Sequence, residues 1–304
     1  MLNSRLSTRV LACTLLAPAL SVAAQDQPVD TTIVDPYGGN RSPQVAESYD
    51  APGAINTGQF SFSAGAELVS IYIFRGAEVQ DDGFILQPWA EISTAIGDTG
   101  FDLTAGIWNS LGTNRDGAQN VGLRGVLETD LYVGTSYELD QFTLSATLTG
   151  YYSPGGYFED IEEIAFGAEY DDSAYLEDWA VNPYALIAFE IRDAGGSEDV
   201  YLELGGALGA PFVDSETMPV ELSFPFAIGF SLDDYNGADG FDWLFLKAGA
   251  EASIALDQIP AEFGSWTAHA ALDLYIVNDD DNLAGLDNGD SFTPVLRVGA
   301  TLEY

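Results

Sequence analysis

Hydrophobic and polar residues alternate along most of the chain beyond residue 60. In the stretch 142–149, for example, Phe142, Leu144, Ala146 and Leu148 alternate with threonine and serine. Successive side chains of a β-strand point to opposite faces, so this pattern predicts strands that lie between an apolar and a polar environment. Turn-forming residues separate twelve such segments, which are expected at 60–75, 84–96, 100–109, 128–139, 141–152, 162–170, 179–192, 200–209, 220–231, 241–256, 264–277 and 292–304.

These strands favour an all-β fold, an antiparallel transmembrane β-barrel of about twelve strands. Segments of about 10 to 16 residues are long enough for a tilted bilayer crossing. No run of 18 or more apolar residues follows residue 24, so we expect no transmembrane helix. A soluble β-sandwich, which keeps its apolar faces inside, is the weaker alternative. Aromatic residues near the segment ends suit two membrane interfaces, namely Phe60, Phe62, Tyr72, Phe74, Tyr132, Tyr151, Tyr152 and Tyr304.

The first residues have the organisation of a secretory signal peptide. Arg5 and Arg9 precede a short apolar core at 10–20, and the small residues Val22 and Ala24 suit a cleavage site after Ala24. The segment that follows is polar, contains proline and glycine, and has no periodicity. We therefore expect a signal peptide at 1–24, a flexible periplasmic leader at 25–58, and an outer-membrane barrel at 59–304.

The two ends of the chain also indicate how the protein is exported and assembled. Cys13 is the only cysteine and lies in the expected signal peptide, so the exported protein should have no disulfide. Tyr304 ends the chain in phase with the apolar face of the last expected strand. A terminal aromatic residue in this position resembles the signal read by the barrel-assembly machinery of the bacterial outer membrane.

The charge is strongly acidic. The chain has 48 acidic and 9 basic residues, and 7 basic residues remain without the signal peptide, so the net charge changes from −39 to near −41. Nucleic acid is an unsuitable partner because phosphate binding needs a basic surface. Cations are the mobile partners that such a field attracts. Adaptation to high salt explains the same composition equally well, and both interpretations stay open.

Several short motifs occur in one order between residues 60 and 170. They are Ser70, Tyr72, Phe74, Arg75, Gly76 and Gln87; then Gly106, Trp108 and Ser110; then Glu128, Asp130, Leu131, Tyr132 and Gly134; and finally Tyr151, Tyr152, Pro154 and Gly155. This series resembles the signatures S-x-Y-x-F-R-G…Q, G-x-W-x-S, E-x-D-L-Y-x-G and Y-Y-x-Y-P-G of the TorF family of porins. In the last motif, Tyr151 and Tyr152 are present, but the tyrosine directly before the proline is missing. The resemblance implies an outer-membrane location and a barrel fold.

Arg75 is the most unusual residue of the first motif, because the chain has so few basic residues. We expect it at the end of the first strand, facing the lumen near the outer mouth, with Tyr72 and Phe74 turned to the outer interface. There it could set an electrostatic step in an acidic pore. The favoured interpretation is a brace, in which the guanidinium pairs with a carboxylate. The candidate carboxylates are Glu67, Glu91, Asp81 and Asp82.

Other charged residues share the polar face of the expected strands. Contacts between Lys247 and Glu251, or between His269 and Asp273, would more often be structural than catalytic. The acidic residues Asp279, Asp281 and Asp287 are weak metal candidates, and a solvated loop is the favoured interpretation, so no metal or other cofactor is predicted. The full set of lumen and selectivity candidates is Glu67, Arg75, Glu91, Lys247, Glu251, His269, Asp273, Arg297 and Glu303.

The favoured function is a porin-like outer-membrane channel for passive diffusion of small solutes, narrow and cation-preferring, and not an enzyme. Its expected partners are outer-membrane lipid and lipopolysaccharide, the barrel-assembly machinery and the permeating solutes, with the oligomeric state left open. One alternative is a closed structural or adhesive barrel whose acidic loops bind divalent cations or surface partners. A barrel hydrolase that uses His269, the only histidine, and a secreted soluble sandwich are weaker alternatives.

Overall fold

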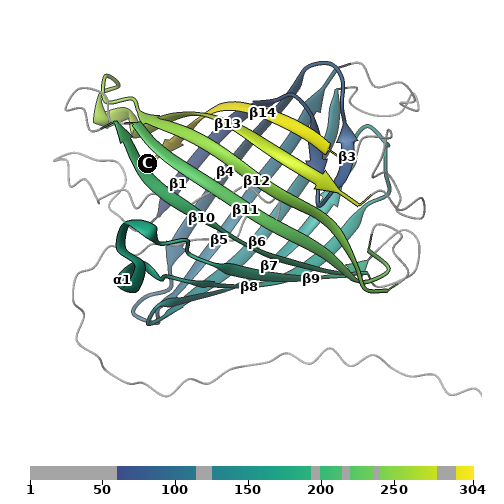
Figure 1. Ribbon diagram of the computed structural model, residues 1–304, viewed down its shortest axis with the longest axis horizontal. Coiled ribbons are helices and arrows are strands. Elements are labelled where there is room, and N and C mark those ends of the chain that lie inside the picture. Colours follow the sequence, from purple (N-terminus) through teal and green to yellow (C-terminus); the bar gives the residue numbers. More distant parts are fainter. Residues whose placement is uncertain (1–59, 114–124, 193–198, 214–219, 236–239, 279–291) are drawn as a thin grey trace, which may run out of the picture.

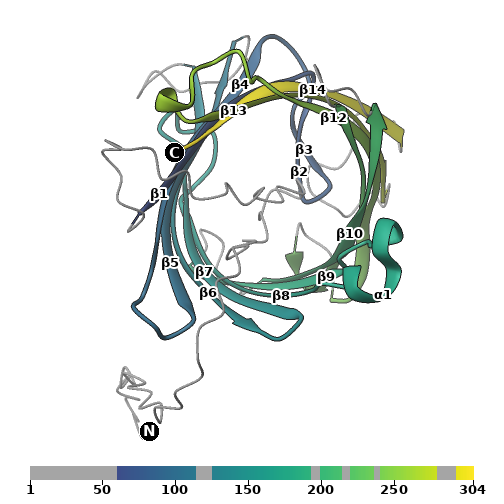
Figure 2. The ribbon, with the colours of Figure 1, turned by 90° about the vertical axis from the view of Figure 1, so that its left-hand side faces the viewer.

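The computed structural model describes residues 60–113, 125–192, 199–213, 220–235, 240–278 and 292–304. Twelve strands form one closed antiparallel barrel (Figures 1 and 2). The predicted fold class is therefore confirmed. The strands are β1 (Ser61–Val69), β4 (Ile85–Ala95), β5 (Phe101–Gly112), β6 (Val126–Leu139), β7 (Phe142–Tyr152), β8 (Ile161–Tyr170), β9 (Tyr184–Arg192), β10 (Val200–Val213), β11 (Val220–Asp233), β12 (Asp242–Ala255), β13 (Ser265–Val277) and β14 (Phe292–Glu303).

Closure of the barrel comes from β1, which pairs with β4 on one side and with β14 on the other. The remaining neighbours in the barrel are also neighbours in sequence. A closed sheet pairs the backbone groups that an open edge would expose. The single closed sheet excludes the β-sandwich alternative, which requires two sheets packed face to face.

The barrel wall is apolar outside and polar inside. Leu148 on β7 is 45% exposed on the outer surface, whereas the next residue, Thr149, is 2% exposed and faces the lumen. The same alternation runs through the other strands, because successive side chains leave a strand on opposite faces. Large outward-facing apolar residues include Leu68, Ile92, Leu103, Leu131, Leu144, Phe166, Leu204, Phe226, Leu246, Leu274, Leu296 and Val298.

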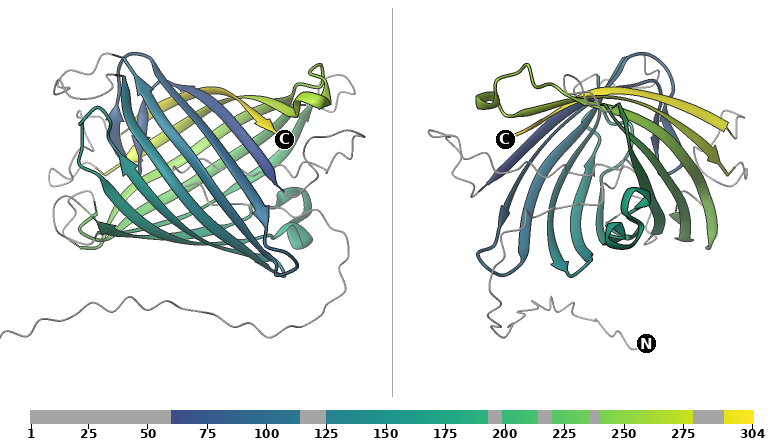
Figure 3. Two further views of the ribbon diagram at one scale, coloured as in Figure 1. Left: turned by 180° about the vertical axis from the view of Figure 1, so that it is seen from behind. Right: turned by 60° about the vertical axis from the view of Figure 1, so that its left-hand side comes forward.

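The two ends of the barrel carry different connections. At one end, here called the terminal end, β1 begins and β14 finishes, and β6 joins β7 through the two residues 140–141, the tight turn that the sequence predicts. The same end carries α1 (Ser173–Leu176), η1 (Glu177–Trp179) and η3 (Ala261–Phe263). The α1 segment lies outside the ring of strands (Figure 2), at the end of the barrel seen on the right in the left panel of Figure 3. None of the described helices is long and apolar enough to cross a membrane.

The prediction of one strand over residues 60–75 is wrong for the second half of that range. Strand β1 ends at Val69, and β2 (Tyr72–Phe74) and β3 (Ala77–Gln80) form a separate hairpin inside the ring of strands (Figure 2). The end of the barrel that carries β2 and β3 is called the hairpin end. Arg75 and Gly76 form the two-residue turn, with φ of 49° and 88°. Positive φ at both turn residues matches the twist of a tight hairpin.

The structure also corrects the expected positions of four aromatic residues, two in the hairpin and two on the barrel wall. Tyr72 is buried and Phe74 is half-buried, and both pack within the lumen rather than toward an outer interface. Tyr132 and Tyr151 also point inward, where their hydroxyls reach lumenal carboxylates. An aromatic residue near a strand end therefore marks an interface only when its parity is that of the outer face.

Candidate functional site

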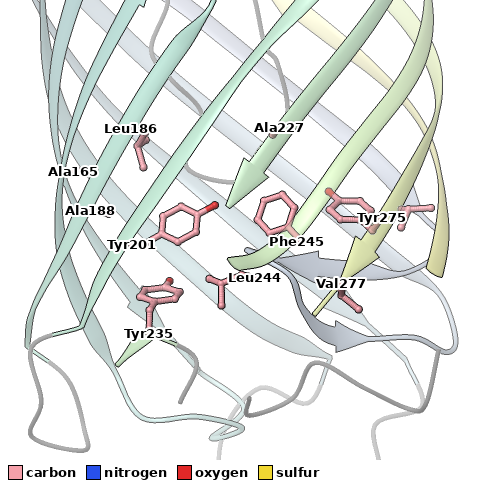
Figure 4. Packing of buried hydrophobic residues seen from close by; sticks show 11 residues of the cluster. Ala165, Leu186, Ala188, Tyr201, Ala227, Tyr235, Leu244, Phe245, Tyr275 and Val277 are labelled. Atoms are coloured by element: carbon pink, nitrogen blue, oxygen red, sulfur yellow. The ribbon is translucent and has the colours of Figure 1, made fainter. Parts of the chain in front are cut away.

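The β2–β3 hairpin packs against both sides of the lumen at the hairpin end. Ile71, Ile73 and Ala77 pack against one buried cluster on the wall (Figure 4). That cluster comprises Ala165, Leu186, Ala188, Tyr201, Ala227, Tyr235, Leu244, Phe245, Tyr275, Val277 and Val295. Phe74 and Val79 pack against a second cluster, which comprises Val69, Tyr72, Ile85, Trp108 and Leu127. Because both faces of the hairpin find apolar partners, the hairpin is packed within the lumen between the two clusters.

The hairpin tip is fixed by an ion pair between Arg75 and Glu163 on β8. The guanidinium donates through Nη1 and Nη2 to the two carboxylate oxygens, with 2.8 Å from Nη2 to Oε1. Nη1 also donates to the Tyr235 hydroxyl at 2.7 Å. Each side chain of the ion pair is only 1% exposed. This bidentate contact joins the hairpin tip to the opposite wall, and it is called the latch.

Aromatic rings surround the guanidinium. Its central carbon lies 4.3 Å from the ring centre of Tyr201, 5.0 Å from that of Phe74 and 5.4 Å from that of Tyr235. Ring faces attract cations, and more strongly where water is excluded. Burial alone lowers the pKa of Arg75, but Glu163 together with Tyr235 and Tyr151 raises it by more, so the group stays charged. The latch is a paired charge inside an aromatic cage.

The base of the hairpin has further anchors. Tyr72 donates a hydrogen bond of 2.8 Å to Glu128 on β6, and its ring lies 5.5 Å from that of Trp108 on β5. The Gln80 amide donates to the carbonyls of Asp82 at 2.8 Å and of Thr113 at 3.2 Å. These contacts fix the direction in which the hairpin enters the lumen.

The sequence motifs become pairs of lumenal residues on neighbouring strands. Across β5 and β6, Gly106 faces Tyr132, Trp108 faces Asp130, and Ser110 faces Glu128. A Cβ at residue 106 would overlap the ring of Tyr132, so glycine at this position leaves room for that ring. The two-residue spacing within each motif therefore places its side chains on the lumenal face, where the register of β5 and β6 pairs them. They build the wall beneath the hairpin together with Gln87, Gly134 and Tyr151.

The partner expected for Arg75 is wrong. The candidates Glu67, Glu91, Asp81 and Asp82 all lie close in sequence, whereas Glu163 is 88 residues away. Sequence reasoning also missed Tyr201 and Tyr235, which contact the Arg75 guanidinium, and Glu203, which accepts a hydrogen bond from Tyr201. Glu163 does carry a sequence signal, because its parity in the sixth expected strand, 162–170, is lumenal. That signal does not identify which lumenal carboxylate the hairpin reaches.

A second ionic network lies farther along the lumen, around Arg297 on β14. The guanidinium donates to Asp273 at 2.8 Å, to Glu67 at 2.9 Å and to Glu251 at 3.1 Å. The network joins β12, β13, β14 and β1, and so crosses the seam between the last and first strands. Four charged candidates from the sequence thus meet in one cluster.

His269 joins this network through Glu67, with 2.7 Å between Nε2 and Oε1, rather than through Asp273. Lys247 is buried on β12, with its Nζ 5.9 Å from the ring centre of Tyr275. Glu91 accepts a hydrogen bond of 3.0 Å from Tyr132.

The last two residues lie at the terminal end of the barrel. Glu303 is half-buried there, and the backbone of Tyr304 pairs with Phe62. The described residues contain no group of three histidine, cysteine, aspartate or glutamate side chains arranged for a metal ion. The weak metal candidates Asp279, Asp281 and Asp287 lie outside the described residues.

Arg297→Met tests the seam network. The change leaves three carboxylates without their cation in a buried position, so we expect a loss of about 3–5 kcal/mol in the free energy of unfolding. Arg192→Met is the matched control. The side chains of Arg192 and Glu162, which form a salt bridge, are 58% and 37% exposed, so this bridge should contribute at most about 1 kcal/mol to the free energy of unfolding. Urea unfolding in detergent micelles measures both. Equal losses in the two variants would contradict the network.

Solved structures with a related shape are barrels of low sequence identity. An outer membrane channel from Pseudomonas putida F1 is 12% identical with a TM-score of 0.44, over 84% of this chain and 99% of that one. The NanC porin is 10% identical with a TM-score of 0.40, over 79% and 98% of the two chains. The translocator domain of the autotransporter NalP from Neisseria meningitidis is 13% identical with a TM-score of 0.40, over 82% and 90%.

Among curated proteins, none matches this sequence. The resemblance to the TorF family of porins stays a prediction. One family does match, over residues 53–224, a range that contains all of the motifs described above. Its description is "Bacterial protein of unknown function (Gcw_chp)". Because the match covers more than half of the 304 residues, the chain belongs to the Gcw_chp family.

Proposed function

We propose that this protein is a porin-like barrel of the bacterial outer membrane, which passes small solutes through a lumen that the β2–β3 hairpin narrows. One observation carries the proposal: a closed barrel with an apolar exterior has a charged, polar lumen that is crossed by a latched hairpin. The wall is apolar outside and polar inside, which is the reverse of the arrangement in a soluble protein. This arrangement suits a bilayer outside the barrel and water inside it.

The outer surface supports the membrane part of the proposal. Exposed aromatic residues lie at both barrel ends, outside the apolar band, as membrane interfaces favour. Trp179, in η1 at the terminal end, is 72% exposed. At the terminal end the set includes Phe60, Phe101, Phe142, Tyr175, Trp179 and Phe263, and at the hairpin end it includes Phe84, Phe241, Trp243 and Phe292.

The proposed orientation places the terminal end in the periplasm. Two of its connections, 96–100 and 140–141, are short, as periplasmic turns usually are. The hairpin end then faces outward, and the expected leader at 25–58 would lie on the periplasmic side. The signal peptide at 1–24, the role of Tyr304 in assembly and the contacts with lipopolysaccharide belong to the same proposal.

Cation preference is supported by the balance of buried charges. Two basic residues, Arg75 and Lys247, are buried in the described part of the lumen. The buried carboxylates there are more numerous, namely Asp102, Glu128, Asp130, Glu163, Glu203 and Asp273. A lumen lined mainly by one sign of charge concentrates ions of the opposite sign.

A closed structural or adhesive barrel is the second candidate, and the filled lumen at the hairpin end favours it. The two candidates share one fold and differ in whether solute crosses. His269 contacts Glu67, whose carboxylate Arg297 also holds, and this shared contact suits a structural role better than a hydrolase.

Purified protein in a planar bilayer tests the channel. Because the lumen is narrow and acidic, we expect small conductance steps and, under a KCl gradient, a reversal potential with the sign of cation selectivity. Heat-modifiable gel migration and outer-membrane fractionation establish that the sample is a folded membrane barrel. Silent bilayers with such a sample would favour the closed barrel, and anion selectivity would overturn the cation preference.

Removal of the hairpin tests its place in the solute path. Val69 and Ile85 pair directly, so a short Gly-Ser turn can replace residues 71–82 without altering the strands. We expect the single-channel conductance to rise several-fold. The control replaces residues 258–263, between β12 and β13 at the terminal end, and should leave conductance unchanged. A hairpin deletion that folds and conducts like the full chain would show that the hairpin does not obstruct the path.

A further inference from the structure

The wall that receives Arg75 has the features of a receptor for one kind of chemical group. We propose that the lumen wall around Glu163 is a guanidinium-binding site, which the chain's own Arg75 occupies in this conformation and which a guanidinium-bearing solute occupies when the hairpin withdraws. The site itself is independent of the proposed function, and only its role for a permeating solute rests on that function.

The groups on the wall match a guanidinium in shape and charge. Glu163 presents both carboxylate oxygens to two guanidinium nitrogens, Tyr235 presents its hydroxyl oxygen, and Tyr201 presents a ring face at 4.3 Å. A planar guanidinium satisfies the carboxylate fork and the ring face together, whereas an ammonium group is a compact point charge without that fork. The site therefore favours guanidinium compounds over amines and metal cations.

The wall holds this geometry through contacts that do not involve the hairpin. Tyr151 donates to Glu163 at 3.2 Å, and the backbone N–H of Tyr235 donates to the Ser231 hydroxyl at 3.0 Å. The rings of Tyr201 and Tyr235 lie 5.1 Å apart. Because the receptor groups hold each other, the site should keep its shape after Arg75 leaves. Glu163 would then be a buried carboxylate without its cation, which favours the entry of another.

The resident guanidinium is held under a conformational constraint that a solute does not share. Arg75 adopts a φ of 49°, which is unfavourable for a residue other than glycine. The tether has the opposite effect and favours Arg75 over a free solute, because the hairpin presents the guanidinium at an effective concentration in the millimolar range for short tethers. Competition by solute guanidinium should therefore appear at millimolar concentrations.

Chemical rescue of Arg75→Ala in the full chain tests the site without any measurement of conductance. In detergent micelles we expect the Tm to fall by roughly 10 °C, and millimolar guanidinium chloride to restore about half of that fall. Potassium chloride at equal ionic strength and urea, a neutral molecule of the same shape, should restore none of it. The double variant Arg75→Ala with Glu163→Gln lacks the carboxylate and should show no recovery with guanidinium.

Recovery that is equal with potassium, or equal in the double variant, would overturn the site. Hydrogen exchange of the wild-type protein provides a second test that needs no variant. Millimolar guanidinium chloride should accelerate exchange of the β2–β3 amides at least threefold relative to potassium chloride, with no change in β13. No acceleration of the hairpin would mean that guanidinium does not compete with Arg75. Positive rescue with silent bilayers would keep the binding site and reject only the channel.

Discussion

The buried ion pair between Arg75 and Glu163 is the interaction on which the arrangement of the lumen depends. A guanidinium and a carboxylate that are each 1% exposed are costly to bury unless they are paired with each other. The pair joins a hairpin near the start of the barrel to the opposite wall, and it fixes the tip of the tight turn in which Arg75 has a φ of 49°. In the same placement, both hairpin faces pack against apolar clusters of the wall.

The barrel explains why so many charges can face inward. Paired backbone groups in a closed sheet let the outer face be fully apolar, and every second residue is then free to be polar. The lumenal carboxylates are held by tyrosine hydroxyls and by the two guanidiniums of Arg75 and Arg297. The latch joins the hairpin to β8 and the Arg297 network crosses the seam, so these two arginines lie where segments distant in sequence are joined.

Much of the fold could be predicted from the sequence, because strand parity is a local property. The outer strands after residue 84, the tight turn at 140–141 and the inward face of Glu67, Glu251, Asp273 and Arg297 follow from alternation alone. The hairpin could not be predicted in this way. Both of its faces are apolar because both face a packed lumen. Tyr72 and Phe74 also continue the apolar parity of the segment that begins at Phe60, so 60–75 reads as one long strand. The partner of Arg75 depends on barrel diameter and tilt, which place Glu163 opposite the tip across 88 residues of sequence.

A double-mutant cycle on the latch tests the central claim most directly. The free energies of unfolding of the wild type, Arg75→Ala, Glu163→Gln and the double variant, measured in the same micelles, give the coupling between the two side chains. A latch that is buried and bidentate predicts a coupling of about 2 kcal/mol or more, with each single variant nearly as unstable as the double. Losses that simply add would contradict the account, because they would mean that the hairpin tip and β8 do not act on each other.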